Sequence, residues 1–154
     1  ARRGGPARRF HGRSFLGVLG GAAKEGWDVV HGSHTFHEVT MYYPMRAIRT
    51  LNHKLILNLA WQLPYPFASD LFDSATWQDV LAGSRPQYGP WKVLDYLQRP
   101  KYELYDLRAD PNESKNLALD PSPSNAKLLE SLANRLKEYQ QATQDPWVVK
   151  YAHE

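Results

Sequence analysis

The densest group of side chains able to do chemistry lies in one short stretch, where three histidines spaced by three residues precede a carboxylate. These are His31, His34, His37 and Glu38. Imidazole and carboxylate groups are common zinc ligands, so a metal site is one interpretation. In a strand, however, His31 and His37 share one face and His34 points to the other. A loop could gather all three, but nothing in the sequence requires one, and we predict no metal site.

A polar rim on a binding pocket is the interpretation that this stretch favours. Histidines near a site serve more often as hydrogen-bonding or acid–base groups than as metal ligands. Glu38 and the nearby Arg46 can hold hydroxyl or anionic substituents. We therefore predict binding rather than catalysis for these side chains.

Recognisable catalytic signatures are missing from the chain. There is no G-x-S-x-G elbow, no P-loop and no H-E-x-x-H pair. The chain has no cysteine, which excludes disulfides, thiolate metal sites and a cysteine nucleophile. We assign no catalytic residue.

The length of 154 residues fits one domain with a loose tail. Residues 1–13 hold five arginines and no acid, and the rest of the chain holds 14 basic and 16 acidic residues. An arginine arm for nucleic acid or a remnant of the gene boundary would explain this tail, and the remnant is favoured because a short basic run is weak support for binding. We expect residues 1–13 to lack fixed structure, residues 14–30 to be a linker, and neither nucleic acid nor a membrane to be a partner.

Two stretches after this linker alternate as half-buried or buried strands do. Met45–Thr50 and Lys54–Leu59 are joined by a plausible tight turn at Leu51–His53, which predicts a β-hairpin. Pro44 is expected at the first residue of its strand, where a missing N–H does least damage. Tyr102–Leu107 alternates again and is a third strand candidate.

The region between the hairpin and this third strand is dominated by aromatic residues and prolines. Trp61–Phe67 contains two prolines and predicts an extended loop. Residues 74–81 predict a short helix, capped by Ser74 or Asp73 and followed by Gly83 as a stop signal.

The clearest element is a long helix near the end of the chain. Its apolar stripe recurs at helical spacing through Leu128, Leu129, Leu132, Leu136 and Tyr139. Ser122 can cap it, with Pro123 at the first helical position and an end near Thr143. The architecture expected is α+β, a small antiparallel sheet packed against a long C-terminal helix.

Two stretches resemble the sulfatase family. Residues 102–118, which include Tyr102-Glu-Leu-Tyr-Asp-Leu107, are similar to a segment near the end of many sulfatases, and residues 46–56 are similar to a hairpin of that family. Residues 32–46 resemble, more narrowly, the sulfamidases within the family, as do Leu63–Phe67 and Asp145–Trp147. The resemblance covers roughly residues 12–150.

What the resemblance implies is the C-terminal subdomain of a larger hydrolase, residues 31–154 here, with about four strands beside a catalytic domain. Sulfatases cleave sulfate esters, and sulfamidases cleave the N–S bond of N-sulfoglucosamine in heparan-type glycans. The family uses a formylglycine nucleophile and a calcium ion, and it works in lysosomes, the periplasm or outside the cell. Ser84-Arg-Pro-Gln-Tyr88 begins like the nucleophile motif Cys/Ser-x-Pro-x-Arg but has Tyr88 in place of arginine. Neither cofactor is therefore assigned to this chain, which alone is expected to be inactive.

The resemblance also suggests what the polar stretch does. His37 and Glu38 are the residues we expect to contact a sulfated glycan, with His34 and Arg46 behind them. A structural alternative is that Glu38 and Arg46 only pair with each other at the seam between domains. A different function is also open, a free-standing carbohydrate-binding or interaction module in which Trp61, Trp77, Tyr88 and Trp91 form a stacking platform.

Overall fold

The computed structural model of the chain describes residues 11–21, 26–83 and 85–153. Most of the predicted basic tail at 1–13 lies outside these ranges, as does Ser84. The elements, in chain order, are helix α1 (Leu16–Leu19), strands β1 (Val29–Phe36), β2 (Tyr42–Thr50) and β3 (His53–Asn58), helices α2 (Ser69–Phe72) and α3 (Ala75–Leu81), strands β4 (Gln87–Tyr88) and β5 (Trp91–Lys92), helix α4 (Val93–Leu97), strand β6 (Tyr102–Asp106), the 3₁₀ turn η1 (Leu117–Leu119), helix α5 (Pro123–Ala142) and the 3₁₀ helix η2 (Pro146–Ala152).

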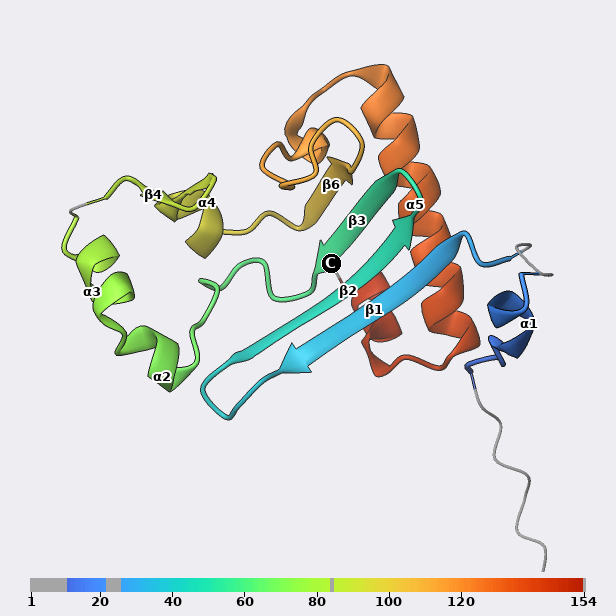
Figure 1. Cartoon of the computed structure of the whole chain (residues 1–154), viewed down its shortest axis with the longest axis horizontal. Coiled ribbons are helices and arrows are strands. Elements are labelled where there is room, and N and C mark those ends of the chain that lie inside the picture. Colours follow the sequence, from blue (N-terminus) through green and yellow to red (C-terminus); the bar gives the residue numbers. More distant parts are fainter. Residues whose placement is uncertain (1–10, 22–25, 84, 154) are drawn as a thin grey trace, which may run out of the picture.

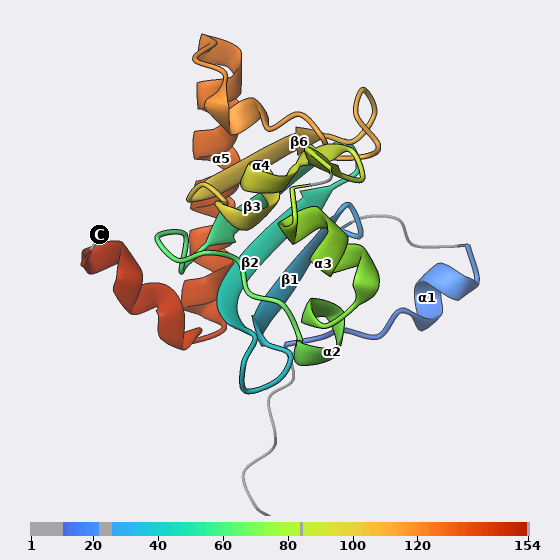
Figure 2. The same ribbon diagram turned by 90° about the vertical axis from the view of Figure 1, so that its left-hand side faces the viewer.

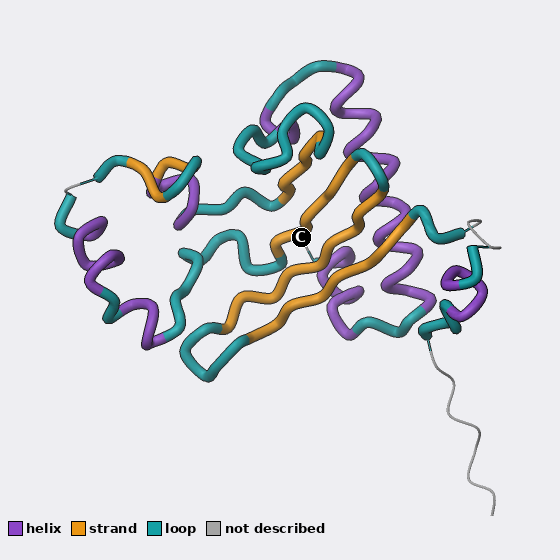
Figure 3. Tube along the Cα trace, viewed as in Figure 1, coloured by secondary structure: helices purple, strands orange, loops and turns teal. Residues whose placement is uncertain are grey.

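A four-stranded sheet and one long helix form the centre of the molecule. The strand order is β1-β2-β3-β6, and every neighbouring pair is antiparallel. Helix α5 lies across one face of this sheet (Figures 1 and 3). The core between them consists of Ile48, Leu55, Leu57, Leu59 and Leu104 from the sheet side and Leu132 and Leu136 from α5. The predicted α+β architecture is confirmed.

The hairpin predicted from alternation is formed by β2 and β3. Arg49 pairs with Lys54, so Leu51 and Asn52 make the turn between the strands. The hydroxyl of Thr50 accepts a hydrogen bond from the backbone N–H of His53 at 3.0 Å and fixes this turn. The apolar residues on the α5 side of both strands are thereby kept in register.

Pro44 differs from its predicted place. Strand β2 begins at Tyr42, so Pro44 is the third residue of a central strand and is fully buried. The missing N–H is tolerated because the register between β1 and β2 shifts between His34 and Phe36, and pairing with β3 begins only at Met45. The Pro44 carbonyl accepts from the backbone N–H of Leu59 at 2.9 Å. Pro44 therefore marks an irregularity in the sheet rather than the end of a strand.

Helix α5 follows the sequence prediction closely. The hydroxyl of Ser122 accepts from the backbone N–H of Asn125 at 3.4 Å, Pro123 is the first helical residue, and Thr143 follows the last turn. Leu132 and Leu136 are 3% and 1% exposed and face the sheet. Of the helices that the structure describes, none combines the length and apolar character needed to cross a bilayer.

The opposite face of the sheet is approached by the aromatic segment 61–100. Figure 2 shows α5 on one side of the sheet and α2, α3 and α4 on the other. Trp77 is 3% exposed and stacks on Phe67 with ring centres 4.0 Å apart, while Tyr96 contacts the rings of both. Short helices and prolines here are held together by aromatic packing instead of by a continuous ladder of hydrogen bonds.

Replacing Leu136 by alanine should lower the free energy of unfolding by about 2–5 kcal/mol, because it leaves a cavity between α5 and the sheet. Urea denaturation followed by circular dichroism measures this. Leu51→Ala in the hairpin turn is the matched control, since Leu51 is 78% exposed, and should change the value by less than about 0.5 kcal/mol. Equal losses in the two variants would contradict the assignment of the core.

Candidate functional site

Arg46 and Asp145, 99 residues apart in sequence, form a two-pronged ion pair between strand β2 and the segment after α5. Arg46 Nε donates to Asp145 Oδ2 at 2.5 Å and Nη2 donates to Oδ1 at 3.1 Å. The Arg46 Nη1 group donates to the backbone oxygens of His34 and Met45 at 3.0 and 2.8 Å. Arg46 is only 8% exposed, and these bonds keep its buried charge satisfied. Arg46 thus pairs with Asp145 and not with Glu38, which answers the structural alternative raised by the sequence.

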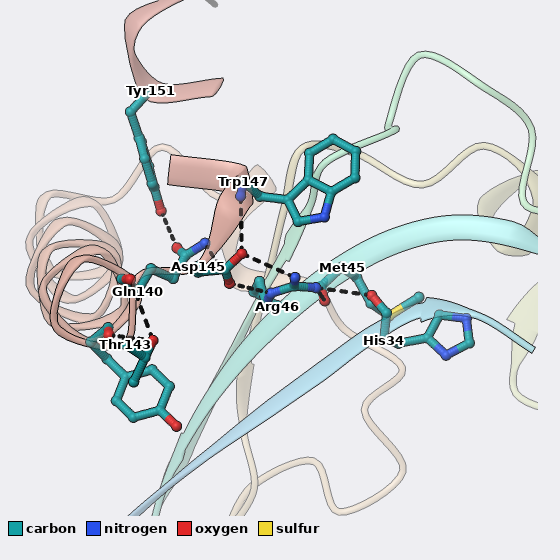
Figure 4. Close-up of polar contacts among 9 residues, drawn as sticks. His34, Met45, Arg46, Gln140, Thr143, Asp145, Trp147 and Tyr151 are labelled. Atoms are coloured by element: carbon teal, nitrogen blue, oxygen red, sulfur yellow. Dashed lines mark hydrogen bonds and ion pairs between the residues drawn. The ribbon is translucent and has the colours of Figure 1, made fainter. Parts of the chain in front are cut away.

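Asp145 is also the cap of the helix η2. Its Oδ1 accepts from the backbone N–H of Trp147 at 3.0 Å, and its Oδ2 accepts from Gln140 Nε2 at 3.3 Å. The Tyr151 hydroxyl donates to Gln140 Oε1 at 2.7 Å, so the network continues into η2 (Figure 4). Asp145 therefore joins the sheet, the end of α5 and η2.

The pKa of the Asp145 carboxyl lies below its ordinary range. Burial of the carboxyl acts to raise the pKa, but hydrogen bonds from Arg46, from the Trp147 backbone and from Gln140, together with the Arg46 charge, lower it further than burial raises it. Asp145 is an anion at neutral pH.

His37 and Glu38 lie in the connection between β1 and β2. The Glu38 carboxylate accepts from the backbone N–H of Ser69, the first residue of α2, at 2.5 Å and from the Thr40 hydroxyl at 2.8 Å. These two bonds, the Ser69 backbone first, lower the pKa of Glu38. His37 is exposed, and its backbone N–H donates to the Met41 carbonyl at 3.2 Å. Glu38 is thus an ionised carboxylate suited to accepting hydrogen bonds from hydroxyl groups, and a poor general acid at neutral pH.

The three histidines do not converge. His31 stacks on Tyr139 of α5 with ring centres 3.7 Å apart, and burial, followed by the charge of Arg135, lowers its pKa. His34 points away from the Arg46–Asp145 network (Figure 4). Its Nε2 is buried and has no hydrogen-bond partner among the described residues. Nowhere in residues 11–21, 26–83 and 85–153 do three His, Asp or Glu side chains gather in a way that could hold a metal ion.

The four predicted site residues lie in two places along the β1–β2 hairpin. His37 and Glu38 are at the exposed tip of the β1–β2 hairpin, while His34 and Arg46 lie behind them along the same pair of strands. Arg46 also borders a small cavity of about 230 Å³ between β1 and the end of α5.

A larger cavity lies elsewhere, and two residues of the alternative stacking platform, Trp61 and Trp91, line it. Its volume is about 930 Å³, and its wall includes Trp61, Trp91 and Tyr96 from the aromatic segment and Glu103 and Tyr105 from β6. None of the four predicted site residues lines it. The alternation of side chains in residues 102–107 predicted that Glu103 and Tyr105 lie on the face of the strand opposite Leu104. No pattern in the neighbouring sequence predicted that Trp61 and Trp91 lie beside them.

A polar cluster centred on Glu103 borders this cavity. Glu103 accepts hydrogen bonds from Asn58 Nδ2 at 2.7 Å and from the Tyr105 hydroxyl at 2.6 Å, and Arg99 Nη1 lies 3.9 Å from its Oε1. Burial, followed by the neighbouring Glu103 carboxylate, raises the pKa of Tyr105 far above its ordinary value. Tyr105 is therefore a neutral hydrogen-bond donor at neutral pH.

Comparison with known proteins gives one close relative in sequence and several in fold. No family model matches the chain. Over 140 residues, 89% of its length, the chain is 41% identical to human N-sulphoglucosamine sulphohydrolase. The chain is related to the sulfatases. It spans only 27% of the length of that human relative.

Solved structures agree with this relationship at the level of the fold. A sulfatase from Bacteroides thetaiotaomicron and a 2-O GAG sulfatase superpose with TM-scores of 0.57 and 0.56. Both share 21% identity with the chain over 94% of its length, and the chain covers 22% of each. The antiparallel sheet and long helix are thus a recurrent part of larger sulfatase chains.

Asp145 should make stability depend on pH. Because its folded pKa is depressed, its contribution is present above the pKa of the unfolded chain and is lost as the pH falls below about 4 through the folded value. Asp145→Asn should lower the free energy of unfolding by about 1.5–3 kcal/mol at pH 7. It should also make that free energy fall less steeply as the pH is lowered. Urea denaturation between pH 7 and pH 3 tests both effects. Asp73→Asn, which removes an exposed acid outside the network, should retain the wild-type slope, and the same slope in Asp145→Asn would argue against the ion pair.

Proposed function

We propose that this chain is the C-terminal region of a sulfatase or sulfamidase-like hydrolase that acts on sulfated glycans of the heparan type. The observation that carries the proposal is the 41% identity to human N-sulphoglucosamine sulphohydrolase over 89% of the chain. In this proposal the chain contributes part of the substrate pocket wall and the packing of the domains, and the bond is cleaved elsewhere.

The catalytic groups belong, in this proposal, to a domain outside the chain. The residues present do not fit a formylglycine or a calcium site. The chain has no cysteine and no complete Cys/Ser-x-Pro-x-Arg motif, and its described residues gather no set of acidic or histidine ligands. Tyr88, which stands where the nucleophile motif requires arginine, instead packs its ring on Trp77 and Tyr96.

Exposed apolar side chains supply a surface for such a domain. Phe36 and Val39 near the tip of the β1–β2 hairpin are 65% and 98% exposed, and Leu71 and Phe72 in α2 are 54% and 47% exposed. The Glu38–Ser69 hydrogen bond holds this tip against α2. Apolar groups gathered in this way are typical of a surface that another domain covers.

The substrate wall is assigned to the four residues singled out in the sequence. The Glu38 carboxylate accepts hydrogen bonds from sugar hydroxyls, and His37 beside it donates to sulfate or hydroxyl oxygens. His34 and Arg46 support the strands behind them. Arg46 does so while paired with Asp145, so it shapes the wall and adds positive potential instead of clamping an anion directly.

A free-standing carbohydrate-binding module is the alternative function. Its proposed platform is divided in the structure: Trp77 and Tyr88 pack within the aromatic segment, whereas Trp61 and Trp91 line the large cavity. The exposed apolar tip and the match to a piece of a larger hydrolase favour the first proposal.

A chimeric enzyme tests the proposal. Residues 29–152 of this chain replace the matching segment of human N-sulphoglucosamine sulphohydrolase, and hydrolysis of N-sulfoglucosamine is followed. The chimera should be active, while the 154-residue chain alone should show no turnover. His37→Ala and Glu38→Gln in the chimera should each lower kcat/KM by about tenfold or more, as expected for lost hydrogen bonds to a charged group.

Glu130→Gln on the exposed face of α5 is the matched control and should leave kcat/KM unchanged. A chimera that folds but is inactive would contradict the assignment of the region. An active chimera that tolerates both His37→Ala and Glu38→Gln would contradict the assignment of the wall.

A further inference from the structure

The large cavity of about 930 Å³ has no role in the function proposed above. It lies between the segment 61–100, the turn around Glu113 and the sheet face opposite α5. Pockets that bind small ligands commonly measure about 300–1,000 Å³, so the volume is sufficient for a short oligosaccharide.

Two tryptophans and two tyrosines supply the aromatic part of its wall. Trp91 is held in place because its indole Nε1 donates to the Glu113 carbonyl at 3.1 Å and its ring contacts Tyr96 with centres 6.3 Å apart. Trp61 is 38% exposed on the loop that follows β3. Indole rings present flat apolar area with a polar edge, which suits the C–H face of a sugar ring. A fixed ring binds with little loss of side-chain entropy.

The charged groups of the cavity leave positive charge available. Lys54 pairs with Glu113, and Arg99 pairs with Glu103, so these four groups largely neutralise one another. Lys92 and Lys115 also line the cavity, are exposed, and have no ion-pair partner among the described residues. The opposing charge that remains is Asp95. The cavity therefore favours a ligand that carries anionic groups around an apolar ring.

We propose that this cavity is a second, non-catalytic binding site for a sulfated oligosaccharide, in which sugar rings pack on Trp61 and Trp91 and sulfate groups pair with Lys92 and Lys115. The cavity and its charges carry the site, and only the choice of a heparan-type ligand rests on the proposed function. Such a site would hold a long glycan at a place separate from the wall formed by His37 and Glu38.

Titration calorimetry on the 154-residue chain tests the proposal with an N-sulfated heparan-type hexasaccharide and its N-desulfated counterpart. The sulfated ligand should bind, and Trp91→Ala should weaken binding at least tenfold, with Trp91→Phe retaining part of the affinity. The double variant Lys92→Gln/Lys115→Gln should weaken binding of the sulfated ligand alone. It should also reduce the dependence of affinity on salt, because two screened charge contacts are lost.

Two controls test whether binding is specific to this cavity. Trp147→Phe changes a tryptophan outside the cavity, and Glu130→Gln changes an exposed acid on α5; both should bind the hexasaccharide as the wild type does. Circular dichroism melting shows whether each variant is folded. The second site would be overturned if the wild-type chain did not bind the sulfated ligand. It would also be overturned if a folded Trp91→Phe or Lys92→Gln/Lys115→Gln variant bound that ligand as tightly as the wild type. Binding that is lost in Glu38→Gln but kept in a folded Trp91→Ala would also overturn the second site, and it would support the wall formed by His37 and Glu38.

Discussion

The ion pair between Arg46 and Asp145 is the contact on which the arrangement of the other elements depends. Burying a guanidinium group costs free energy unless its N–H groups are hydrogen-bonded. Arg46 makes two hydrogen bonds to the Asp145 carboxylate and two to the backbone of β1 and β2. The carboxylate in turn caps η2 and accepts from Gln140. The Arg46–Asp145 ion pair thereby fixes the orientation of α5 on the sheet at the C-terminal end of the helix, and apolar packing fixes it along the rest of the helix.

The same contact places the two surfaces to which we assign function. Strands β1 and β2 extend beyond the network to the hairpin tip that carries His37 and Glu38, and the face turned away from α5 is left for polar and aromatic groups. Glu103 and Tyr105 occupy that face because Leu104 between them must reach the core. One alternating strand therefore supports the core on one side and the large cavity on the other.

Elements governed by local sequence could be predicted, and contacts between distant segments could not. The cap at Ser122, the leucine stripe of α5 and the turn at Leu51–Asn52 each depend on neighbouring residues. The partner of Arg46 is 99 residues away, and no pattern in the sequence distinguishes Asp145 from the nearer Glu38. Pro44 misled the prediction of the strand boundary because the irregularity in β1 that accommodates it lies in another strand. The cavity was missed for the same reason, since its aromatic and charged residues come from segments as far apart as Lys54 and Lys115.

The claim that this chain is one region of a sulfatase-like hydrolase is tested most directly by sequencing the coding locus upstream of residue 1 in all reading frames. The proposed function, in a chain that spans 27% of its human relative, predicts an upstream Cys/Ser-x-Pro-x-Arg motif together with aspartates able to bind calcium. A promoter immediately upstream, with no such motif in any frame, would contradict it and would leave glycan binding through the large cavity as the function to pursue.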